Sequence, residues 1–285
     1  MVRVGLLFVV LGVGLDVDRD APRVTLNPSV IPPGEFFVIT VEPPGGETVQ
    51  TVRAGVLDFH PRFYRFGEKW KAVGAVSAKT PPGRYPVYVK VGRSDGTELE
   101  TKVYLTVTAK RFPRQRIRMS AEKMRLRTAA ALARDKAKLD QAIAESAPQP
   151  LWEGNFILPV RGRFSTGFGV IRTVNGQDAG RHYGLDIAAP AGTPIKATNH
   201  GRVTLAEMLE THGNTIVIDH GCGVFSLYLH LSRIDVQVGD EVRKGQVIGR
   251  VGTTGFSTGP HLHWGVRVAE VPTNPWRWMQ APPKL

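Results

Sequence analysis

The stretch that decides the fold is HYGLDI at residues 182–187, read together with HLHW at residues 261–264. The glycine and the strand-like Leu-Asp-Ile favour an extended backbone over a helix in the first stretch. Alternate residues of a strand share one face, so His182 and Asp186 are predicted to point the same way, with the glycine leaving space between them. The same period of two places both imidazoles of the second stretch on one face, while the leucine between them turns into the core.

These residue types predict a metal centre. Two histidines and one carboxylate are suitable zinc ligands, and three protein ligands plus a water make the arrangement of a catalytic zinc site. His230, which follows a β run at residues 224–228, supplies a further imidazole. Histidines that are not ligands can act as a general base or donate hydrogen bonds to a developing oxyanion. The helical H-E-x-x-H motif is absent, so a histidine must serve as the base. Spacing alone does not separate ligand from base within residues 261–263.

The same region resembles the lysostaphin/LytM-type zinc metallopeptidase domain over less than half of the chain. The stretches that carry the resemblance are FSTGFG at 164–169, HYGLDIAAPAGTP at 182–194, GNTIVIDHG at 213–221, YLHLS at 228–232, the run 238–249, and TGPHLHW at 258–264.

The resemblance implies a cell-wall endopeptidase that hydrolyses peptide bonds in peptidoglycan stems or cross-links and holds one Zn²⁺ per chain. By matching positions, His182, Asp186 and His263 would bind the zinc. His230 and His261 would be the catalytic histidines, one taking the proton of the attacking water and the other stabilising the oxyanion. Which of the two plays which role is left open.

One departure from the family bears on the substrate. Lysostaphin-like members have a tyrosine shortly before the first zinc ligand, whereas residues 176–181 contain none. This favours the branch similar to enzymes of didermal bacteria, which cut stem-peptide cross-links, over a pentaglycine substrate. Within the same domain, Asn214 is a candidate for contact with the substrate.

The chain begins with one positive charge and an apolar run at residues 4–15, followed by acidic residues. This pattern predicts a signal peptide or anchor over residues 1–16, and export to the periplasm or cell envelope of a bacterium; a buried first strand is the alternative. No apolar run reaches the roughly 18 residues that span a bilayer, which excludes a polytopic membrane protein. Cys222 is the single cysteine, which excludes a disulfide framework and a Cys-based zinc knuckle.

The chain is expected to be mainly β. Over residues 22–109, short β-rich runs alternate with Pro/Gly turns, which predicts an immunoglobulin-like β-sandwich that serves as a spacer or binding module. Residues 150–285 are again β-rich and form the predicted LytM-type peptidase domain.

Between them, residues 110–149 carry 11 basic and 4 acidic side chains, which is +7 of the chain's net +12. Ser120 is a plausible N-cap before an Ala-rich stretch whose apolar stripe comprises Met124, Ala131, Leu132, Leu139 and Ile143. We therefore predict a basic connecting helix that packs by this stripe against a neighbour or over the groove of the peptidase domain. The charge suits an anionic envelope polymer or a membrane surface, with a solvated helix face as the alternative. No nucleic-acid partner is expected, and no feature specifies an oligomer.

Other conspicuous residues have structural interpretations. His220, at a predicted strand end, is expected to be structural, and His200 and His212 are expected in surface turns. The Cys222 thiol is expected to be buried and idle, because zinc chemistry needs no thiol nucleophile. The aromatic residues expected in the core rather than on a sugar-binding surface are Trp264, Trp276 and Trp278.

Two other classes of function remain to be weighed. Some relatives of this family have lost their ligands and act as non-enzymatic wall-binding or activator modules for another hydrolase. Here all five metal and catalytic positions are filled, although residues 110–149 are a candidate for an inhibitory segment. A biotinyl- or lipoyl-type carrier domain is rejected, because Lys244 lacks flanking methionines and a carrier would not need the histidines.

Overall fold

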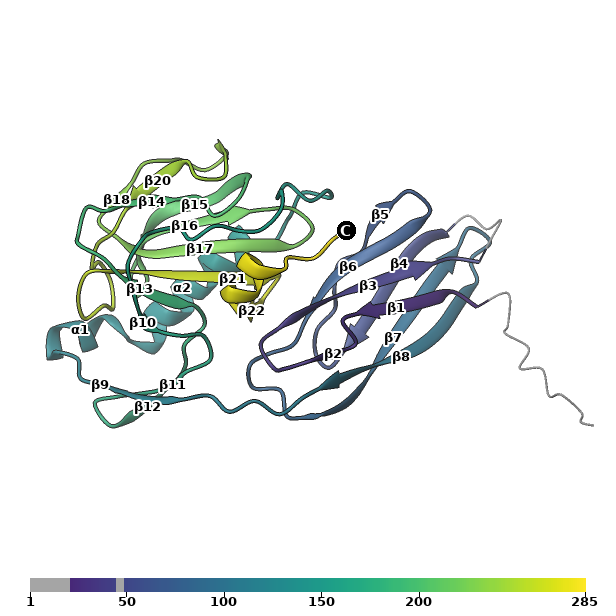
Figure 1. The fold of residues 1–285 in the computed structure, drawn as a ribbon, viewed down its shortest axis with the longest axis horizontal. Coiled ribbons are helices and arrows are strands. Elements are labelled where there is room, and N and C mark those ends of the chain that lie inside the picture. The colour runs from purple at the N-terminus through teal and green to yellow at the C-terminus, as the bar shows by residue number, and fades with distance from the viewer. Residues whose placement is uncertain (1–20, 45–48) are drawn as a thin grey trace, which may run out of the picture.

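The chain folds into two β-rich parts that lie end to end, joined by a partly helical segment (Figure 1). The structure, a computed structural model, describes residues 21–44 and 49–285. The mainly β class is confirmed. The predicted signal peptide or anchor at residues 1–16 lies outside the described residues. Within the described ranges, no helix combines the length and the apolar character that crossing a membrane requires.

Two four-stranded sheets form the N-terminal part. Its strands are β1 (Arg23–Asn27), β2 (Val30–Ile31), β3 (Phe36–Glu42), β4 (Val49–Val56), β5 (Tyr64–Phe66), β6 (Lys69–Ala75), β7 (Gly83–Arg93) and β8 (Glu98–Val107). The sheet orders are β1-β3-β6-β5 and β2-β8-β7-β4. Phe37, Ile39 and Val41 repeat at the strand period of two and are fully buried in the core. The immunoglobulin-like outline of this part stays a prediction.

The C-terminal part is built on an eight-stranded sheet. Its elements are β10 (Arg163–Thr166), β11 (Ile171–Val174), β12 (Gln177–Arg181), β13 (Leu185–Ala188), β14 (Pro194–Lys196), β15 (Gly201–Leu209), β16 (Gly213–Asp219), β17 (Val224–Leu231), β18 (Arg233–Ile234), β19 (Glu241–Val242), β20 (Val247–Arg250), β21 (His261–Val268), β22 (Val271–Thr273) and α3 (Pro275–Gln280). The main sheet has the order β10-β13-β21-β17-β16-β15-β19, with β22 paired to β21. Its central strands β17 and β21 carry His230, His261 and His263.

The connecting segment is not the single helix predicted from the sequence. It comprises β9 (Arg114–Ile117), α1 (Ala121–Leu126) and α2 (Ala129–Ala142). Ser120 is the expected N-cap, since its side chain accepts a hydrogen bond from the Lys123 amide. The helix ends early because the Thr128 hydroxyl caps a second helix by accepting from the Ala131 amide at 3.0 Å. The strand β9 pairs in parallel with β11, so the segment adds a strand to the C-terminal part.

The apolar face of α2 packs on the C-terminal part, as predicted for a helix that needs a neighbour. Leu139 and Ile143 are buried with Leu205, Phe225 and Leu229 on one side of the main sheet. Figure 1 shows α2 lying against this sheet. The predicted stripe is only partly correct, since the Leu132 side chain is 40% exposed instead of buried.

The two β-rich parts meet at α3. The Asn274 amide donates to the Gly34 carbonyl at 2.8 Å, and the Phe36 and Trp278 ring centroids are 4.3 Å apart. Trp278 and Trp264 are fully buried, as expected. The expectation of a core position is wrong for Trp276, which is 39% exposed. Its ring is tilted by 48° against that of Phe164, with ring centroids 4.7 Å apart.

Candidate active site

Strand register brings the predicted ligands together. In the antiparallel pair of β13 and β21, Asp186 lies directly opposite His263, which places their side chains on one face at short range. His261 shares that face two residues earlier, while Leu262 between them is fully buried, as the period of two predicted. His182 stands in the connection before β13, so the extended strand expected over residues 182–187 begins only at Leu185.

Three donor atoms converge at one point. His182 Nε2 lies 2.8 Å from Asp186 Oδ1 and 2.8 Å from His263 Nδ1, and His263 Nδ1 lies 2.9 Å from Asp186 Oδ1. All three side chains are buried or nearly so, with exposures of 2%, 8% and 15%. Two imidazole nitrogens and one carboxylate oxygen that face one another in this way form a donor set that a zinc ion would take.

Gly184 makes room for this cluster, although not in the way the sequence suggested. A Cβ at Gly184 would lie 2.6 Å from His263 Nε2 and 2.6 Å from the Trp264 carbonyl oxygen. The space that the glycine provides is therefore occupied by the edge of the His263 ring and by the Trp264 carbonyl.

Neighbouring groups orient the ligands. His182 Nδ1 donates to the Gly167 carbonyl at 2.8 Å, which leaves Nε2 of the neutral ring with its lone pair toward the cluster. Arg172 Nη2 lies 2.5 Å from Asp186 Oδ2, the oxygen that does not face the histidines. Arg172 Nε donates to Gln115 of β9 at 3.1 Å. A second contact thus sets the direction of two of the three donor groups, His182 and Asp186.

The cluster favours the protonation states that a metal requires. Burial by itself would raise the pKa of Asp186, but hydrogen bonds from His182 and His263 outweigh it and hold this pKa well below the ordinary range. Burial lowers the pKa of His263 to about 4, against the opposing effect of Asp186. Near neutral pH the site therefore presents a carboxylate and a neutral imidazole.

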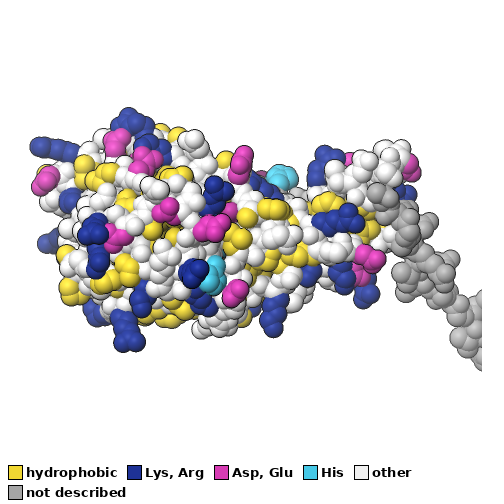
Figure 2. All heavy atoms as spheres, turned by 90° about the horizontal axis from the view of Figure 1, so that it is seen from above, with side chains coloured by type: hydrophobic (Ala, Val, Ile, Leu, Met, Phe, Trp, Pro, Cys, Tyr) yellow, Lys and Arg dark blue, Asp and Glu magenta, His cyan; other side chains and the backbone are white. Residues whose placement is uncertain are grey.

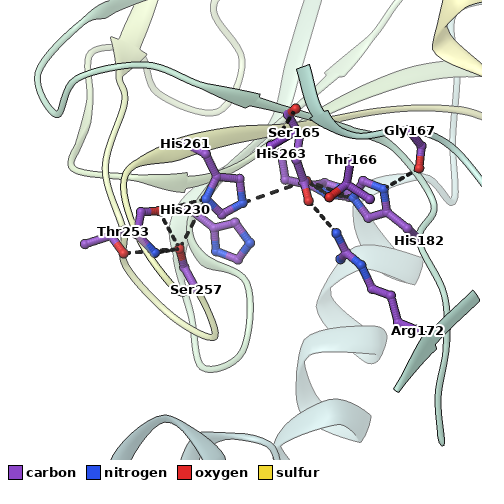
Figure 3. Close-up of polar contacts among 12 residues, drawn as sticks. Ser165, Thr166, Gly167, Arg172, His182, His230, Thr253, Ser257, His261 and His263 are labelled. Atoms are coloured by element: carbon purple, nitrogen blue, oxygen red, sulfur yellow. Dashed lines mark hydrogen bonds and ion pairs between the residues drawn. The ribbon is translucent and has the colours of Figure 1, made fainter. Parts of the chain in front are cut away.

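His230 and His261 stand beside the cluster with fixed tautomers. His230 Nδ1 donates to the Thr254 carbonyl at 2.9 Å, and His261 Nδ1 donates to the Gly259 carbonyl at 2.8 Å. Figure 3 shows the two rings beside each other. In the neutral form of either ring, Nε2 therefore keeps a lone pair that can accept a proton. Their ring centroids are 4.9 Å apart, and His261 Nε2 lies 3.7 Å from Asp186 Oδ1. Burial and the neighbouring His261 and His263 lower the pKa of His230 well below its ordinary value, so it is neutral at pH 7.

All five histidine and aspartate side chains line one cavity of about 290 Å³. The opposite wall comes partly from the connecting segment, which contributes Ile117, Met119, Arg127 and Leu132. Arg127 donates to the Ala179 carbonyl, and its guanidinium lies over the Phe256 ring at 5.5 Å. The cavity is thus shared between the β domain and the segment before it.

Several residues differ from their predicted roles. Asn214 does not line the cavity; its side-chain amide donates to the Leu231 carbonyl at 3.0 Å. His212 lies in a turn, as expected, yet it also lines the cavity and bonds the buried Asp135 of α2. Neither Asp135 nor Arg172 was singled out from the sequence. The sequence does not indicate which residues Asp135 and Arg172 contact, because their partners lie in other elements.

The remaining expectations for single residues agree with the structure. His220 is fully buried, with Nδ1 bonded to the His200 carbonyl at 2.6 Å and Nε2 to Ser226 Oγ at 2.7 Å, so it is structural. Cys222 is buried, and burial raises the pKa of its thiol to about 12, which makes it unreactive.

Comparison with known proteins gives consistent matches. A model of "Peptidase family M23" matches residues 180–275. DD-carboxypeptidase/endopeptidase Mpg of Neisseria meningitidis is 48% identical over 94 residues, which are 33% of this chain and 22% of Mpg. Peptidoglycan DD-endopeptidase ShyA of Vibrio cholerae is 44% identical over 93 residues, again 33% of this chain and 22% of ShyA. The matches thus cover only about a fifth of these curated relatives.

One solved structure is similar over nearly its whole length. It is a crystal structure from Pseudomonas aeruginosa, described as that of a candidate M23 peptidase, with 31% identity and a TM-score of 0.63. The similarity covers 88% of this chain and 95% of that one, so it includes both β-rich parts and the segment between them.

Proposed function

Because the chain belongs to peptidase family M23, a family of metallopeptidases, we propose that it is a zinc-dependent endopeptidase that hydrolyses peptide bonds in peptidoglycan stems or cross-links. The observation that carries this proposal is the convergence of His182, Asp186 and His263 within one cavity that also holds His230 and His261.

The donor set fits zinc, and each remaining histidine has a task. His182 Nε2, Asp186 Oδ1 and His263 Nδ1 would hold the ion. When bound, zinc polarises the scissile carbonyl and lowers the pKa of a bound water to about 7. The Nδ1 atoms of His230 and His261 donate to backbone carbonyls, so Nε2 of either ring, in its neutral form, can take the proton of the attacking water. The ring that is protonated can donate a hydrogen bond to the oxyanion.

The names of the relatives and one sequence feature support stem-peptide cross-links as the substrate. Mpg and ShyA are both named as endopeptidases, and ShyA as a peptidoglycan DD-endopeptidase. Residues 176–181 lack the tyrosine of lysostaphin-like members. The site of action would be the periplasm or cell envelope, which requires export of the chain.

The basic residues before α1 support an anionic envelope polymer or membrane surface as a partner. Arg114, Arg116 and Arg118 are exposed at alternate positions of the strand β9 and its continuation. By contrast, Arg134 and Lys138 of α2 pair with acidic side chains of β15 and the turn after it. On the face shown in Figure 2, Lys and Arg side chains are scattered among acidic ones instead of forming one large patch.

This partner is tested by sedimentation with a polyphosphate, which stands for an anionic envelope polymer, or with anionic vesicles. We expect replacement of the three arginines by glutamine to lower the binding affinity and to make that affinity less dependent on salt concentration. Equal binding by the variant and the wild type would contradict this role.

The enzymatic proposal is tested with the purified full chain. Bound zinc is measured by mass spectrometry, and new amine termini are counted after incubation with purified peptidoglycan. We expect about one zinc per chain and amine release that His263→Ala abolishes. His60→Ala, which changes an exposed histidine of the N-terminal part, is the matched control and should behave as wild type.

A zinc-loaded protein that releases no amines from several peptidoglycan types would overturn the proposal. A non-enzymatic or autoinhibited wall-binding or activator module would then take its place, tested by adding the protein to a second, active hydrolase.

A further inference from the structure

We propose that the connecting segment is a working part of the active site, in which Asp135 and Lys123 are positioning residues for His230. The proposal rests on the proposed function only in that it takes His230 as catalytic. Both residues lie outside residues 180–275, where the family model matches. They act through the backbone carbonyls of His212 and Thr254, which lie in two different loops.

The backbone of His230 needs external support. Its φ of 67° lies in the left-handed region, which is unfavourable for a side chain other than glycine and persists only where surrounding contacts impose it. Two contacts do so. The His230 amide donates to the His212 carbonyl at 3.0 Å, and its ring Nδ1 donates to the Thr254 carbonyl at 2.9 Å. The direction of the His230 ring therefore depends on where these two carbonyls stand.

Asp135 holds the first carbonyl. This α2 carboxylate is 2% exposed and accepts from the Glu210 amide at 2.9 Å, the Thr211 amide at 2.7 Å and Thr211 Oγ1 at 2.5 Å. It also accepts from His212 Nδ1 at 2.8 Å and from the His212 amide at 3.3 Å. Five donors of one three-residue turn thus meet a single buried carboxylate, and charge-assisted bonds of this kind are strong. The turn that carries the His212 carbonyl is fixed to α2.

Lys123 holds the loop that carries the second carbonyl, that of Thr254. The ammonium of this α1 residue donates to the Gly255 carbonyl at 2.8 Å and lies 3.3 Å from the Thr253 carbonyl, on either side of Thr254. The two loops are also joined to each other, because the Phe256 amide donates to the Thr211 carbonyl at 2.8 Å. The connecting segment therefore contacts both loops, and these two loops determine the direction of the His230 ring.

The consequence for catalysis follows from the geometry. A misplacement of a catalytic group by about 1 Å can cost roughly 100-fold in rate. In Asp135→Asn, whichever way the amide is turned, its NH₂ group faces at least one backbone N–H. We therefore expect kcat to fall about 10- to 100-fold, while the zinc ligands on β13 and β21 stay in place. Lys123→Met removes one of two supports and should lower kcat about 3- to 10-fold.

The test uses the full chain and two matched controls. Asp140→Asn makes the same chemical change on the same helix at a position whose side chain is 45% exposed, and Lys136→Met removes one exposed lysine of the same segment. For every variant we would measure kcat and KM on soluble peptidoglycan peptides, bound zinc, and hydrogen exchange of the His230 amide. We expect lower kcat with unchanged KM and zinc, and faster His230 exchange, in Asp135→Asn and Lys123→Met only. Lys123→Arg, which keeps a donor, should recover part of the loss.

Wild-type kcat and wild-type exchange in both variants would overturn the proposal. Higher activity in them would also overturn it, because the segment would then be an inhibitor. If Asp135→Asn does not fold, Lys123→Met decides, since its side chain is only partly buried. If the wild type hydrolyses nothing, the proposed function fails, but the exchange of the His230 amide still tests the positioning contacts.

Discussion

At the scale of single residues, the site depends on groups that touch the ligands without being ligands. The two carboxylate oxygens of Asp186 have different partners. Oδ1 faces His182 and His263, and Oδ2 faces Arg172. The Arg172 guanidinium is only 20% exposed and is itself held by Gln115. Such contacts orient a metal ligand, and their loss typically weakens metal binding substantially.

Arg172→Leu should therefore weaken zinc binding by about 10- to 100-fold, because Asp186 Oδ2 loses its partner and the carboxylate can rotate. Competition with a zinc chelator measures the affinity. Arg163→Leu, at an exposed position of β10, is the control and should bind zinc as the wild type does. Equal affinities of the two variants would argue against a positioning role of Arg172.

Gly184→Ala should also weaken zinc binding, for a steric reason. The added methyl would lie 2.6 Å from His263 Nε2, and overpacking of this kind costs about 1–3 kcal/mol, or roughly 5- to 150-fold in affinity. Gly55→Ala, where the nearest atom would be 3.6 Å away, is the control. Zinc affinity that does not change in Gly184→Ala would mean that His263 can move aside freely.

At the scale of elements, local hydrogen bonds decide where strands and helices end. The strand β16 ends at Asp219, and the buried His220 that follows it ties this end to His200 and to Ser226 of β17. Burial lowers the pKa of His220 from 6.5 to about 4, against a weaker opposing effect of the His200 carbonyl. Between about pH 4 and pH 6.5, the His220 ring is thus neutral in the folded protein and protonated in the unfolded chain.

This shift predicts a pH-dependent stability. Because the folded-state pKa is depressed, the contribution of His220 is fully present above pH 6.5 and is lost as the pH falls toward 4. Between pH 7.5 and pH 5 the loss should be about 2 kcal/mol. Urea unfolding at both pH values should show a smaller pH dependence for His220→Gln than for wild type. His60→Gln, at an exposed position, should keep the wild-type difference.

At the scale of the whole molecule, the two β-rich parts share one hydrophobic cluster that runs through α3. Phe36 of the N-terminal part packs on Trp278, and the Asn274 side chain donates to Glu35 at 2.9 Å. The C-terminal part also holds the connecting segment through β9 and α2. The peptidase site is therefore embedded in a structure that extends well beyond the residues of the family model.

Trp278→Ala should lower the free energy of unfolding by about 3–5 kcal/mol, the usual cost of deleting a buried aromatic side chain. Trp276→Ala removes a neighbouring tryptophan that is 39% exposed, so it should cost clearly less. Chemical denaturation followed by circular dichroism measures both. Similar losses in the two variants would contradict the assignment of Trp278 as the residue that joins the parts.

The sequence by itself determined the β class, the period-two placement of His261 and His263 about a buried Leu262, and the family resemblance. These depend on local backbone geometry and on which residue types stand at which spacing. Only the tertiary structure decided that Asp186 faces His263, that Thr128 breaks the connecting helix, and that Asp135 and Lys123 reach the loops beside His230. The physical reason is that strand register and helix packing bring together groups far apart in the chain, and a buried carboxylate on a helix has no local signature of the donors it will meet.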